Sequence, residues 1–308
     1  MSLEVTFLGT SGAVPTPERN PIGILLRREG ERFLFDVGEG IQRQMMTFTT
    51  GFALDHVVIT HLHGDHYYGL PGLLETLEFN GRTRALKIHV PARRTRRLAR
   101  FIEVTVGETE FPILINGLSP GDIAVDQDDY HLEAVAVDHD TEAIGVALVE
   151  AARPGRFDRQ RALDLGVPEG PMFGRLQDGE SVELGDGTVV TSDEVLGPPR
   201  PGRRVVYSGD TRPTPSVEAI ATEADLLIHE ATFGDDRADR AAETGHSTAT
   251  QAGKLARDAG VRKLALVHTS SRYAGQRGRL RKEAETIFEG ETILPADGDT
   301  IDVTFRDE

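Results

Sequence analysis

Short runs of alternating or continuous apolar residues, separated by glycine and proline, recur along the whole chain. Runs of this kind predict β-strands at 3–9, 22–28, 32–38, 55–60, 85–90, 130–138, 143–150, 203–210, 224–230, 263–269 and 299–305. Longer stretches between them predict helices at roughly 40–48, 69–79, 92–104, 214–222, 247–259 and 276–287. Ser247 is the expected N-cap of the fifth helix. Strands interleaved with helices predict a layered α/β fold that forms a single domain over residues 1–308.

One long segment interrupts this pattern. Residues 151–180 lie between two predicted strands and are rich in glycine, proline and arginine. Four arginines and one aspartate give residues 152–161 a local charge of +3. Loops of this length without evident secondary structure are usually functional or disordered. We therefore expect an excursion inserted within the domain, not a linker between two domains.

Charge and composition narrow the class of protein. Fifty acidic residues against 34 basic ones give a net charge of −16, and only four of the basic residues are lysines. A lysine-poor acidic surface keeps a protein hydrated at high salt, so we predict adaptation to a saline cytoplasm, with an ordinary acidic protein as the alternative. The chain has no cysteine, which excludes disulfides, cysteine-bearing zinc sites and thiol catalysis. Without a long apolar run or a signal-peptide pattern, we expect a cytoplasmic protein with no membrane partner.

A dense cluster of metal-binding residue types follows the strand predicted at 55–60. In His61-Leu62-His63-Gly64-Asp65-His66, alternate residues of an extended segment face one side, so His61 and His63 reach one ion. Gly64 then permits a turn that presents Asp65 and His66 to a second ion. The alternative is a loop of solvated or helix-capping histidines.

Three further candidate ligands stand at the ends of predicted strands: His139, Asp210 and His268. The natural sharing places His61, His63 and His139 on one ion, Asp65, His66 and His268 on the other, and Asp210 between them. Nitrogen and oxygen donors without thiolate favour two zinc ions per subunit, with manganese or iron as alternatives.

This spacing resembles the metallo-β-lactamase superfamily, which implies an αββα sandwich with two metals at one edge. Shorter motifs resemble the ribonuclease Z family of tRNA 3′-processing endonucleases across essentially the whole chain: residues 7–12, 208–211, 229–232, 245–248 and 268–273. The resemblance implies cleavage of precursor tRNA after the discriminator base, which leaves a 3′-hydroxyl on the tRNA and a 5′-phosphate on the trailer. It also implies a homodimer.

The resemblance assigns roles to individual residues. Asp65 is expected to act as general base in addition to binding metal. His246 is suited to protonating the leaving 3′-oxygen, and Glu230 to orienting His246, although Glu230 could instead be structural. Arg272 is expected to hold a phosphate, with a plain salt bridge as the alternative.

The excursion at 151–180 resembles the arm, or exosite, with which that family grips tRNA, and each arm of the dimer would reach RNA at the other subunit's site. Its expected RNA-binding residues are Arg153, Arg156, Arg159, Arg161, Gly170 and Pro171.

Two features stay undecided by the sequence. In the loop after the first strand, Pro17 replaces a lysine of the family pattern, which leaves the contact of that loop with the acceptor stem open. Arg93, Arg96, Arg97 and Arg100 form a basic stripe at helical spacing that could follow RNA or could be a solvated face. Two other functions also remain: a small-molecule phosphodiesterase or arylsulfatase-like hydrolase, and a metal-stabilised RNA-binding protein without catalysis.

Overall fold

The computed structural model describes residues 2–306, which divide into two compact units. The first unit comprises residues 2–126, 131–149 and 203–306, and the second comprises 127–130 and 150–202. No helix within residues 2–306 is both long enough and apolar enough to cross a lipid bilayer.

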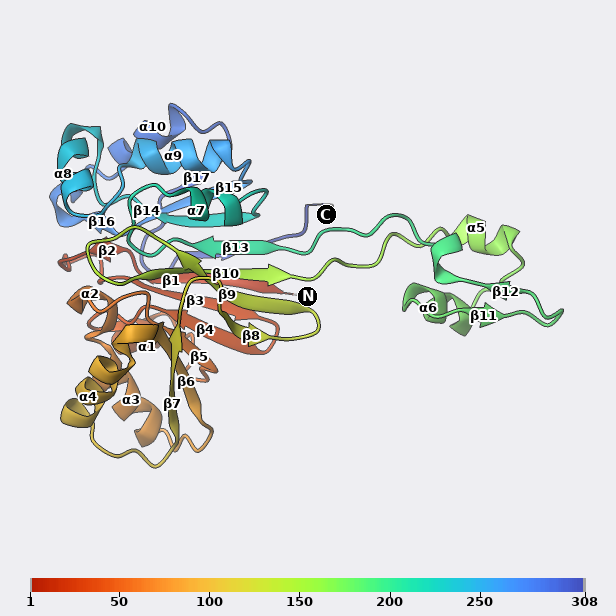
Figure 1. The fold of residues 1–308 in the computed structure, drawn as a ribbon, viewed down its shortest axis with the longest axis horizontal. Helices are drawn as coiled ribbons and strands as arrows, with labels where there is room; N and C mark the ends of the chain where they lie inside the picture. The colour runs from red at the N-terminus through yellow and green to blue at the C-terminus, as the bar shows by residue number, and fades with distance from the viewer. Residues whose placement is uncertain (1, 307–308) are drawn as a thin grey trace. The chain divides into compact units, whose positions relative to one another are not determined.

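Two seven-stranded mixed sheets form the centre of the first unit (Figure 1). The strands of the first sheet are, in spatial order, β18 (Thr300–Asp302), β1 (Leu3–Gly9), β3 (Gly23–Arg28), β4 (Glu31–Phe35), β5 (His56–Val58), β6 (Leu86–Pro91) and β7 (Ile113–Leu118). Those of the second sheet are β17 (Glu291–Ile293), β15 (Lys263–Val267), β14 (Leu226–Glu230), β13 (Arg204–Tyr207), β10 (Ile144–Glu150), β9 (Tyr130–Ala136) and β8 (Ile123–Asp126). A short parallel pair joins β2 (Ser11–Gly12) to β16 (Thr269–Ser270).

Parallel pairing of strands in both sheets determines where the candidate metal ligands lie. Strands β4, β5, β6 and β7 pair in parallel, as do β13, β14, β15 and β17. The carboxyl ends of parallel neighbours lie at one edge of a sheet, and the loops that follow them gather there.

Helices cover the outer face of each sheet. On the first sheet these are α1 (Ile41–Thr47), α2 (Gly64–Tyr67), α3 (Leu70–Phe79) and, after the 3₁₀ turn η1 (Ala92–Arg94), α4 (Thr95–Thr105). On the second they are α7 (Pro215–Ile220), α9 (Ala249–Asp258) and α10 (Gly278–Glu285). The remaining short helices of this unit are η3 (Asp235–Arg237), α8 (Ala238–Glu243) and η4 (Ser271–Tyr273). This is the αββα sandwich that the resemblance to the metallo-β-lactamase superfamily implied.

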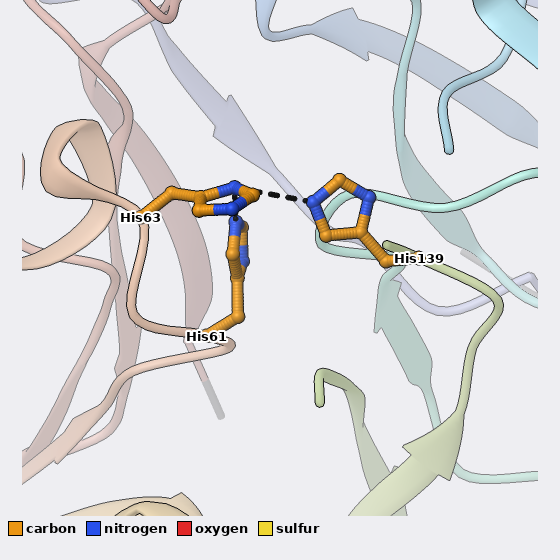
Figure 2. Close-up of side chains that lie close together, drawn as sticks. All are labelled: His61, His63 and His139. Carbon is orange, nitrogen blue, oxygen red and sulfur yellow. Dashed lines mark hydrogen bonds between the residues drawn. The ribbon is translucent and has the colours of Figure 1, made fainter. Parts of the chain in front are cut away.

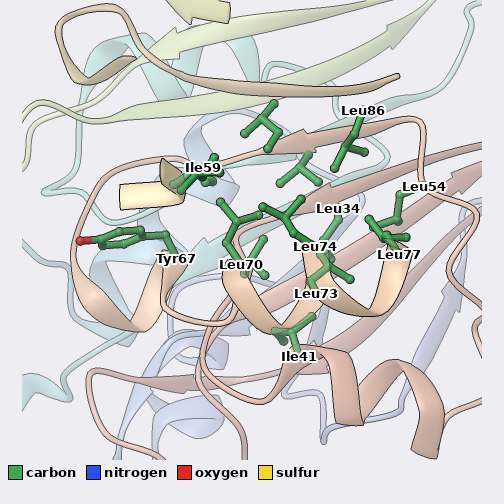
Figure 3. Packing of buried hydrophobic residues seen from close by; sticks show 14 of the residues in the cluster. Leu34, Ile41, Leu54, Ile59, Tyr67, Leu70, Leu73, Leu74, Leu77 and Leu86 are labelled. Carbon is green, nitrogen blue, oxygen red and sulfur yellow. The ribbon is translucent and has the colours of Figure 1, made fainter. Parts of the chain in front are cut away.

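The buried apolar residues explain why these helices lie where they do. Leu70, Leu73, Leu74 and Leu77 follow the i, i+3, i+4, i+7 spacing of one helix face, and all four are buried against the first sheet (Figure 3). Between the sheets, Phe35 of β4 stacks on Tyr207 of β13 with ring centroids 6.1 Å apart. Each sheet is therefore covered on both faces.

The predicted elements are all present, with ends shifted by a few residues. The predicted N-cap is wrong by one position. Thr248 caps α9 by accepting from the backbone N–H of Gln251, whose side chain accepts from Thr248 N–H in return. Ser247 instead donates its hydroxyl to Thr211 O at 2.7 Å and is fully buried.

The second unit has its own small core. It contains α5 (Arg159–Asp164), α6 (Pro171–Gln177), β11 (Val182–Glu183), β12 (Val189–Val190) and the turn η2 (Ser192–Glu194). These elements bury Ala162, Val167, Leu176, Val182, Val190 and Val195. The unit closes on itself, because the backbones of Arg153 and Arg200 exchange two hydrogen bonds of 2.7 and 2.9 Å. It extends beyond the segment 151–180 that the composition singled out.

A buried histidine pair makes the first sheet sensitive to acid. His56 Nδ1 lies 3.0 Å from His89 Nε2, and the two side chains come from neighbouring strands, β5 and β6. Burial, together with the charge of nearby Lys87, lowers the pKa of each ring to about 4. In the unfolded chain both titrate near 6.5. Stability from the neutral pair is therefore complete above about pH 6.5 and is lost as the pH falls toward about 4.

We expect roughly 3 kcal/mol of stability to be lost across that interval as the pair becomes protonated. The measurement is the free energy of unfolding at neutral and mildly acidic pH with a chelator present, so that metal binding does not contribute. The variant His56→Phe/His89→Leu should show a much flatter dependence. Equal slopes for the variant and the wild type would show that this pair is not the source.

Candidate active site

All seven predicted metal ligands come together at one edge of the first unit. His61 and His63 follow β5, Asp65 and His66 belong to α2, and the others follow strands of the second sheet. Within residues 2–306, four groups of three side chains have ligand atoms within 4.8 Å of one another. These groups are His61, His63, His139; His61, His66, Asp210; Asp65, His66, His268; and Asp210, His246, His268.

The first histidine group has the dimensions of a tetrahedral metal site (Figure 2). His63 Nδ1 lies 3.0 Å from His61 Nε2 and 3.3 Å from His139 Nε2. Ligand nitrogens at zinc–nitrogen distances of 2.0–2.1 Å stand about 3.3 Å apart on a tetrahedron. The three rings converge from two elements and present one nitrogen each to a common point.

The second group is equally compact. His268 Nε2 lies 3.0 Å from Asp65 Oδ2 and 3.3 Å from His66 Nε2. Asp210 Oδ2 is 3.3 Å from His66 Nε2, 3.4 Å from His268 Nε2 and 3.7 Å from His61 Nε2, so it lies between the two groups. Its Oδ1 is buried and has no hydrogen-bond partner in the described structure. An orphaned buried carboxylate oxygen is costly unless an ion binds it, so the donor set fits two metal ions.

Hydrogen bonds to residues outside the ligand groups fix which ring nitrogen His66, His139 and His268 present to a metal. His66 Nδ1 lies 2.8 Å from Asp36 Oδ2, and His139 Nδ1 lies 2.8 Å from the carbonyl oxygen of Gly245. His268 Nδ1 is 2.9 Å from the Thr232 hydroxyl. When one ring nitrogen is engaged in this way, the other is left free to bind a metal.

Asp36 is a site residue that the sequence analysis missed. Its fully buried carboxylate accepts from the hydroxyl of Tyr207 at 2.8 Å and from both the hydroxyl and the backbone N–H of Thr60. It also adopts a left-handed φ of 56°, which is unfavourable for a residue with a side chain. The available signal is an acidic residue directly after residues 32–35. The predicted strand 32–38 includes that residue, so its position at a strand end is hidden.

Asp140 is a second missed residue. Its Oδ1 lies 3.2 Å from His139 Nε2 and 3.6 Å from His63 Nε2, and half of its side chain is exposed. It places a negative charge at the open side of the first histidine group.

Glu230 and His246 form a hydrogen-bonded pair beside the ligands. His246 Nδ1 lies 2.8 Å from Glu230 Oε1, and the other oxygen of Glu230 accepts from Thr232. Burial favours the neutral imidazole, but the carboxylates of Glu230 and Asp210 raise the pKa of His246 to about 9. His246 Nδ1 is 3.9 Å from Asp210 Oδ2, so the protonated ring stands next to the second group of ligands.

The loop between the first strand and β3 reaches the site through its backbone. Ala13 N–H donates to Asp65 Oδ2 at 2.7 Å. Arg19 and Asn20 are buried and hold the loop in place: the Arg19 guanidinium donates to Thr269, and Asn20 N–H donates to Asp297. Pro17, where the family pattern has lysine, is exposed at the tip of this loop.

The structure gives a different reason for the glycine at position 64 from the one predicted. Gly64 has no left-handed φ and begins α2. A Cβ at this position would stand 2.4 Å from Cε2 of Tyr68, so a larger residue here would displace the exposed ring that lies over it.

The predicted phosphate-binding residues are distributed over both units. Arg272 is exposed in η4, four residues after His268, and has no ion pair with any residue in 2–306. Arg156, Arg159 and Arg161 line one open hollow of the second unit. Arg159 is paired there with Glu169, and Gly170 and Pro171 begin α6. Arg153 forms the backbone pair with Arg200 described above.

This chain is similar to known proteins over its whole length. The model of the Anti-Pycsar protein Apyc1 matches residues 3–109, and the Beta-lactamase superfamily domain matches residues 184–269. Ribonuclease Z of Natronomonas pharaonis is 57% identical over 308 residues, with 100% of both chains covered. Ribonuclease Z of Haloferax volcanii is 50% identical (100% and 97% covered), and that of Myxococcus xanthus is 47% identical (99% of each covered).

Solved structures agree. Human tRNase Z, short form, has a TM-score of 0.71 at 27% identity, with 98% of this chain and 100% of that chain covered. The metallo-beta-lactamase fold protein YhfI of Bacillus subtilis shares the fold, with a TM-score of 0.72 at 19% identity and the same coverage. With full-length relatives such as the one at 57% identity, this chain belongs to the ribonuclease Z family.

Proposed function

We propose that this chain is a metal-dependent endoribonuclease that removes 3′ trailers from precursor tRNA. It cuts after the discriminator base and leaves a 3′-hydroxyl on the tRNA and a 5′-phosphate on the trailer. The observation that carries the proposal is the convergence of seven ligand side chains with the Glu230–His246 pair, in a chain of the ribonuclease Z family. A protein that only bound RNA would have no chemical need for this complete set.

The metal site takes two zinc ions in this proposal, with manganese or iron as alternatives. One ion would be held by His61, His63 and His139 and the other by Asp65, His66 and His268, with Asp210 as a further ligand between the two groups. When bound, such a pair supplies Lewis-acid stabilisation of the phosphate and lowers the pKa of a water molecule. The nitrogen distances of 3.0 and 3.3 Å and the unpartnered Asp210 Oδ1 support this assignment.

The chain's own residues orient and move protons. Asp65, held by Ala13 N–H, is placed to accept a proton from the attacking water. His246 is protonated at neutral pH and donates its proton to the leaving 3′-oxygen. Glu230 keeps the imidazole in the required orientation, because its Oε1 lies 2.8 Å from His246 Nδ1. Arg272, exposed and unpaired within 2–306, is free to bind a phosphate of the RNA.

The second unit serves as the tRNA-binding arm in this proposal, and the enzyme acts as a homodimer. Arg156, Arg159 and Arg161 bring positive charge to one hollow, although residues 150–202 carry ten acidic residues against six arginines. Asp158 and Glu194 also line this hollow, so its excess of positive charge is small and local, as expected for a contact with a few phosphates. The small core of the unit supports treating it as a module that can be removed as a whole.

The test removes the arm and compares two substrates. Because Arg153 and Arg200 pair through their backbones, a short Gly-Ser link in place of residues 154–199 keeps both ends of the arm in register. Processing of a 3′-extended precursor tRNA should fall roughly 10²- to 10³-fold, since each charged phosphate contact contributes about 1.5–3 kcal/mol. Hydrolysis of a small activated phosphodiester should survive, because it needs the metal site alone.

An assay of the wild-type enzyme also identifies which reaction it catalyses. The cleavage position and the end groups of both products are read from labelled precursor tRNA. Cleavage of the small phosphodiester with no action on precursor tRNA would replace the proposal with a small-molecule phosphodiesterase. Unchanged processing by the armless variant would show that residues 154–199 do not bind tRNA.

A further inference from the structure

The basic stripe on α4 has no role in the site described above. Residues 92–101 contain five arginines and no acidic residue, in a chain with a net charge of −16. Helix α4 buries Leu98 and Ile102 and exposes the arginines on its other side. A surface that serves only hydration at high salt would carry acidic residues there, as most of this chain does. The stripe therefore indicates binding of an anion.

Three of the four arginines of the stripe are available for such a ligand, whereas the fourth, Arg97, interacts with Tyr67. Arg93 and Arg96 are exposed, and neither side chain has an ion pair with any residue in the described part of the chain. Arg100 is 75% exposed and has a single carboxylate neighbour, the equally exposed Glu103 at 3.6 Å.

An exposed aromatic ring stands beside the stripe. Tyr68 follows the metal ligand His66 by two residues, and 58% of it is exposed. Its ring lies over Gly64 of the metal-binding segment and stacks against Phe101 of α4, with centroids 6.2 Å apart. Tyr68 therefore links the ligand-bearing helix α2 to the arginine-bearing helix α4.

The start of the stripe is attached to the metal site. Arg93 N–H donates to Glu142 at 3.1 Å, and the Arg94 guanidinium donates to the Thr141 hydroxyl at 2.9 Å. Thr141 and Glu142 follow the ligand His139 by two and three residues. The arginines thus begin next to the first histidine group and continue along an eleven-residue helix, a length of about 16 Å.

We propose that Tyr68 and the exposed arginines Arg93, Arg96 and Arg100 bind the single-stranded 3′ trailer of the precursor tRNA. This inference rests on the proposed function and specifies which part of the substrate occupies this surface. A row of phosphate-binding arginines next to an exposed aromatic ring is the arrangement that binds unpaired nucleic acid, because only an unpaired base has a free face to stack. On the tRNA side of the cut the acceptor stem is double-stranded, whereas the trailer supplies consecutive unpaired nucleotides.

The length of α4 and the high salt concentration expected around this protein agree with a single-stranded trailer as the ligand. At about 3.4 Å per stacked nucleotide, the helix length corresponds to about five nucleotides. At 1 M salt the screening length is only about 3 Å, so a useful contact must be direct. Arginine makes direct bidentate contacts with phosphate and stacks on bases, which lysine does not, and the stripe contains arginine only.

The experiment compares two precursor tRNAs that differ only in trailer length. One carries a single trailer nucleotide and the other carries about six, enough to cover α4. For Arg93→Ala/Arg96→Ala, and separately for Tyr68→Ala, kcat/KM with the long trailer should fall about tenfold, while cleavage of the short trailer is unchanged. Tyr68→Phe keeps the ring and should behave as the wild type. The salt slope for the double variant should drop by about 1.4, since each lost contact to a single strand removes about 0.7.

The matched control is Arg257→Ala/Arg281→Ala, which removes two exposed arginines from α9 and α10 on the second sheet. It should affect both substrates equally and weakly. Equal losses on both trailers for the α4 variants, or no loss on either, would overturn the proposal. Failure of the wild type to cleave either precursor is a separate result that would remove the proposed function itself.

Discussion

Replacing His63 by alanine should abolish one metal site and most of the cleavage together. His63 Nδ1 is within 3.3 Å of both partner nitrogens, so its loss leaves His61 and His139 as an incomplete set. Losing the Lewis-acid contribution of one ion removes several kcal/mol of transition-state stabilisation, which corresponds to a decrease of at least about 10³-fold. His63 is the right position for the test, because 43% of its side chain is exposed whereas His61 is fully buried.

The measurement is metal content per chain alongside the single-turnover rate on precursor tRNA. Wild type stripped with a chelator should regain activity when zinc is restored, and the variant should not. His131→Ala is the matched control, since His131 lies on β9, outside the ligand groups, and has a half-buried contact with Glu133. Retention of two metal equivalents by His63→Ala would remove His63 from the ligand set.

The sequence predicts the strands and helices of the sandwich well wherever one hydrophobic periodicity continues through the whole element. The inner strands of both sheets carry continuous or alternating apolar runs, and α3 and α9 carry a regular apolar face. The edge strands β7 and β8 were not predicted. Their apolar runs, 113–115 and 123–125, are shorter than the roughly four to eight residues that mark a strand, and most of these side chains are exposed or half-buried.

The ligand side chains could be found because each stands at a strand end or in one short motif. Asp36 also stands at the end of a strand, but the predicted strand 32–38 included it, and its partners His66 and Tyr207 are remote in the sequence. Gly64 shows the same limit: the chain turns there as expected, from extended His63 into α2, but without a left-handed φ, and the contact with Tyr68 exists only in three dimensions. Spacing identifies donors, whereas the hydrogen bonds that orient them depend on the packing of both sheets.

The arm illustrates a third limit. Composition singled out residues 151–180 by their arginine, glycine and proline, yet the compact unit runs from 150 to 202. Val182, Val190 and Val195 complete its core, but they are isolated apolar residues in a polar segment and give no periodic signal. A variant cut at 180 would leave part of that core exposed, which is why the armless variant proposed above spans 154–199.

Replacing His246 by alanine should slow cleavage of precursor tRNA roughly 10²- to 10⁴-fold with little change in affinity, the range expected for loss of a proton donor. The Glu230 carboxylate holds the ring at 2.8 Å, and Glu230→Gln should therefore give a smaller decrease of the same kind. Both variants should retain two metal equivalents, since neither residue belongs to the two proposed ligand sets. The readouts are the single-turnover rate and the dissociation constant for precursor tRNA, measured separately.

A second substrate separates proton donation from a merely structural role. The 3′-oxygen of the tRNA is a poor leaving group and needs a proton, whereas a nitrophenolate departs without one. For a small nitrophenyl phosphodiester, His246→Ala should therefore react nearly as fast as the wild type, although the same metal site performs both reactions. An equal loss on both substrates would mean that His246 supports the geometry of Asp210, 3.9 Å away, instead of serving the leaving group. A collapse of tRNA affinity with an intact single-turnover rate would make His246 a binding residue. The proton-donor role requires the large effect to follow the leaving group alone.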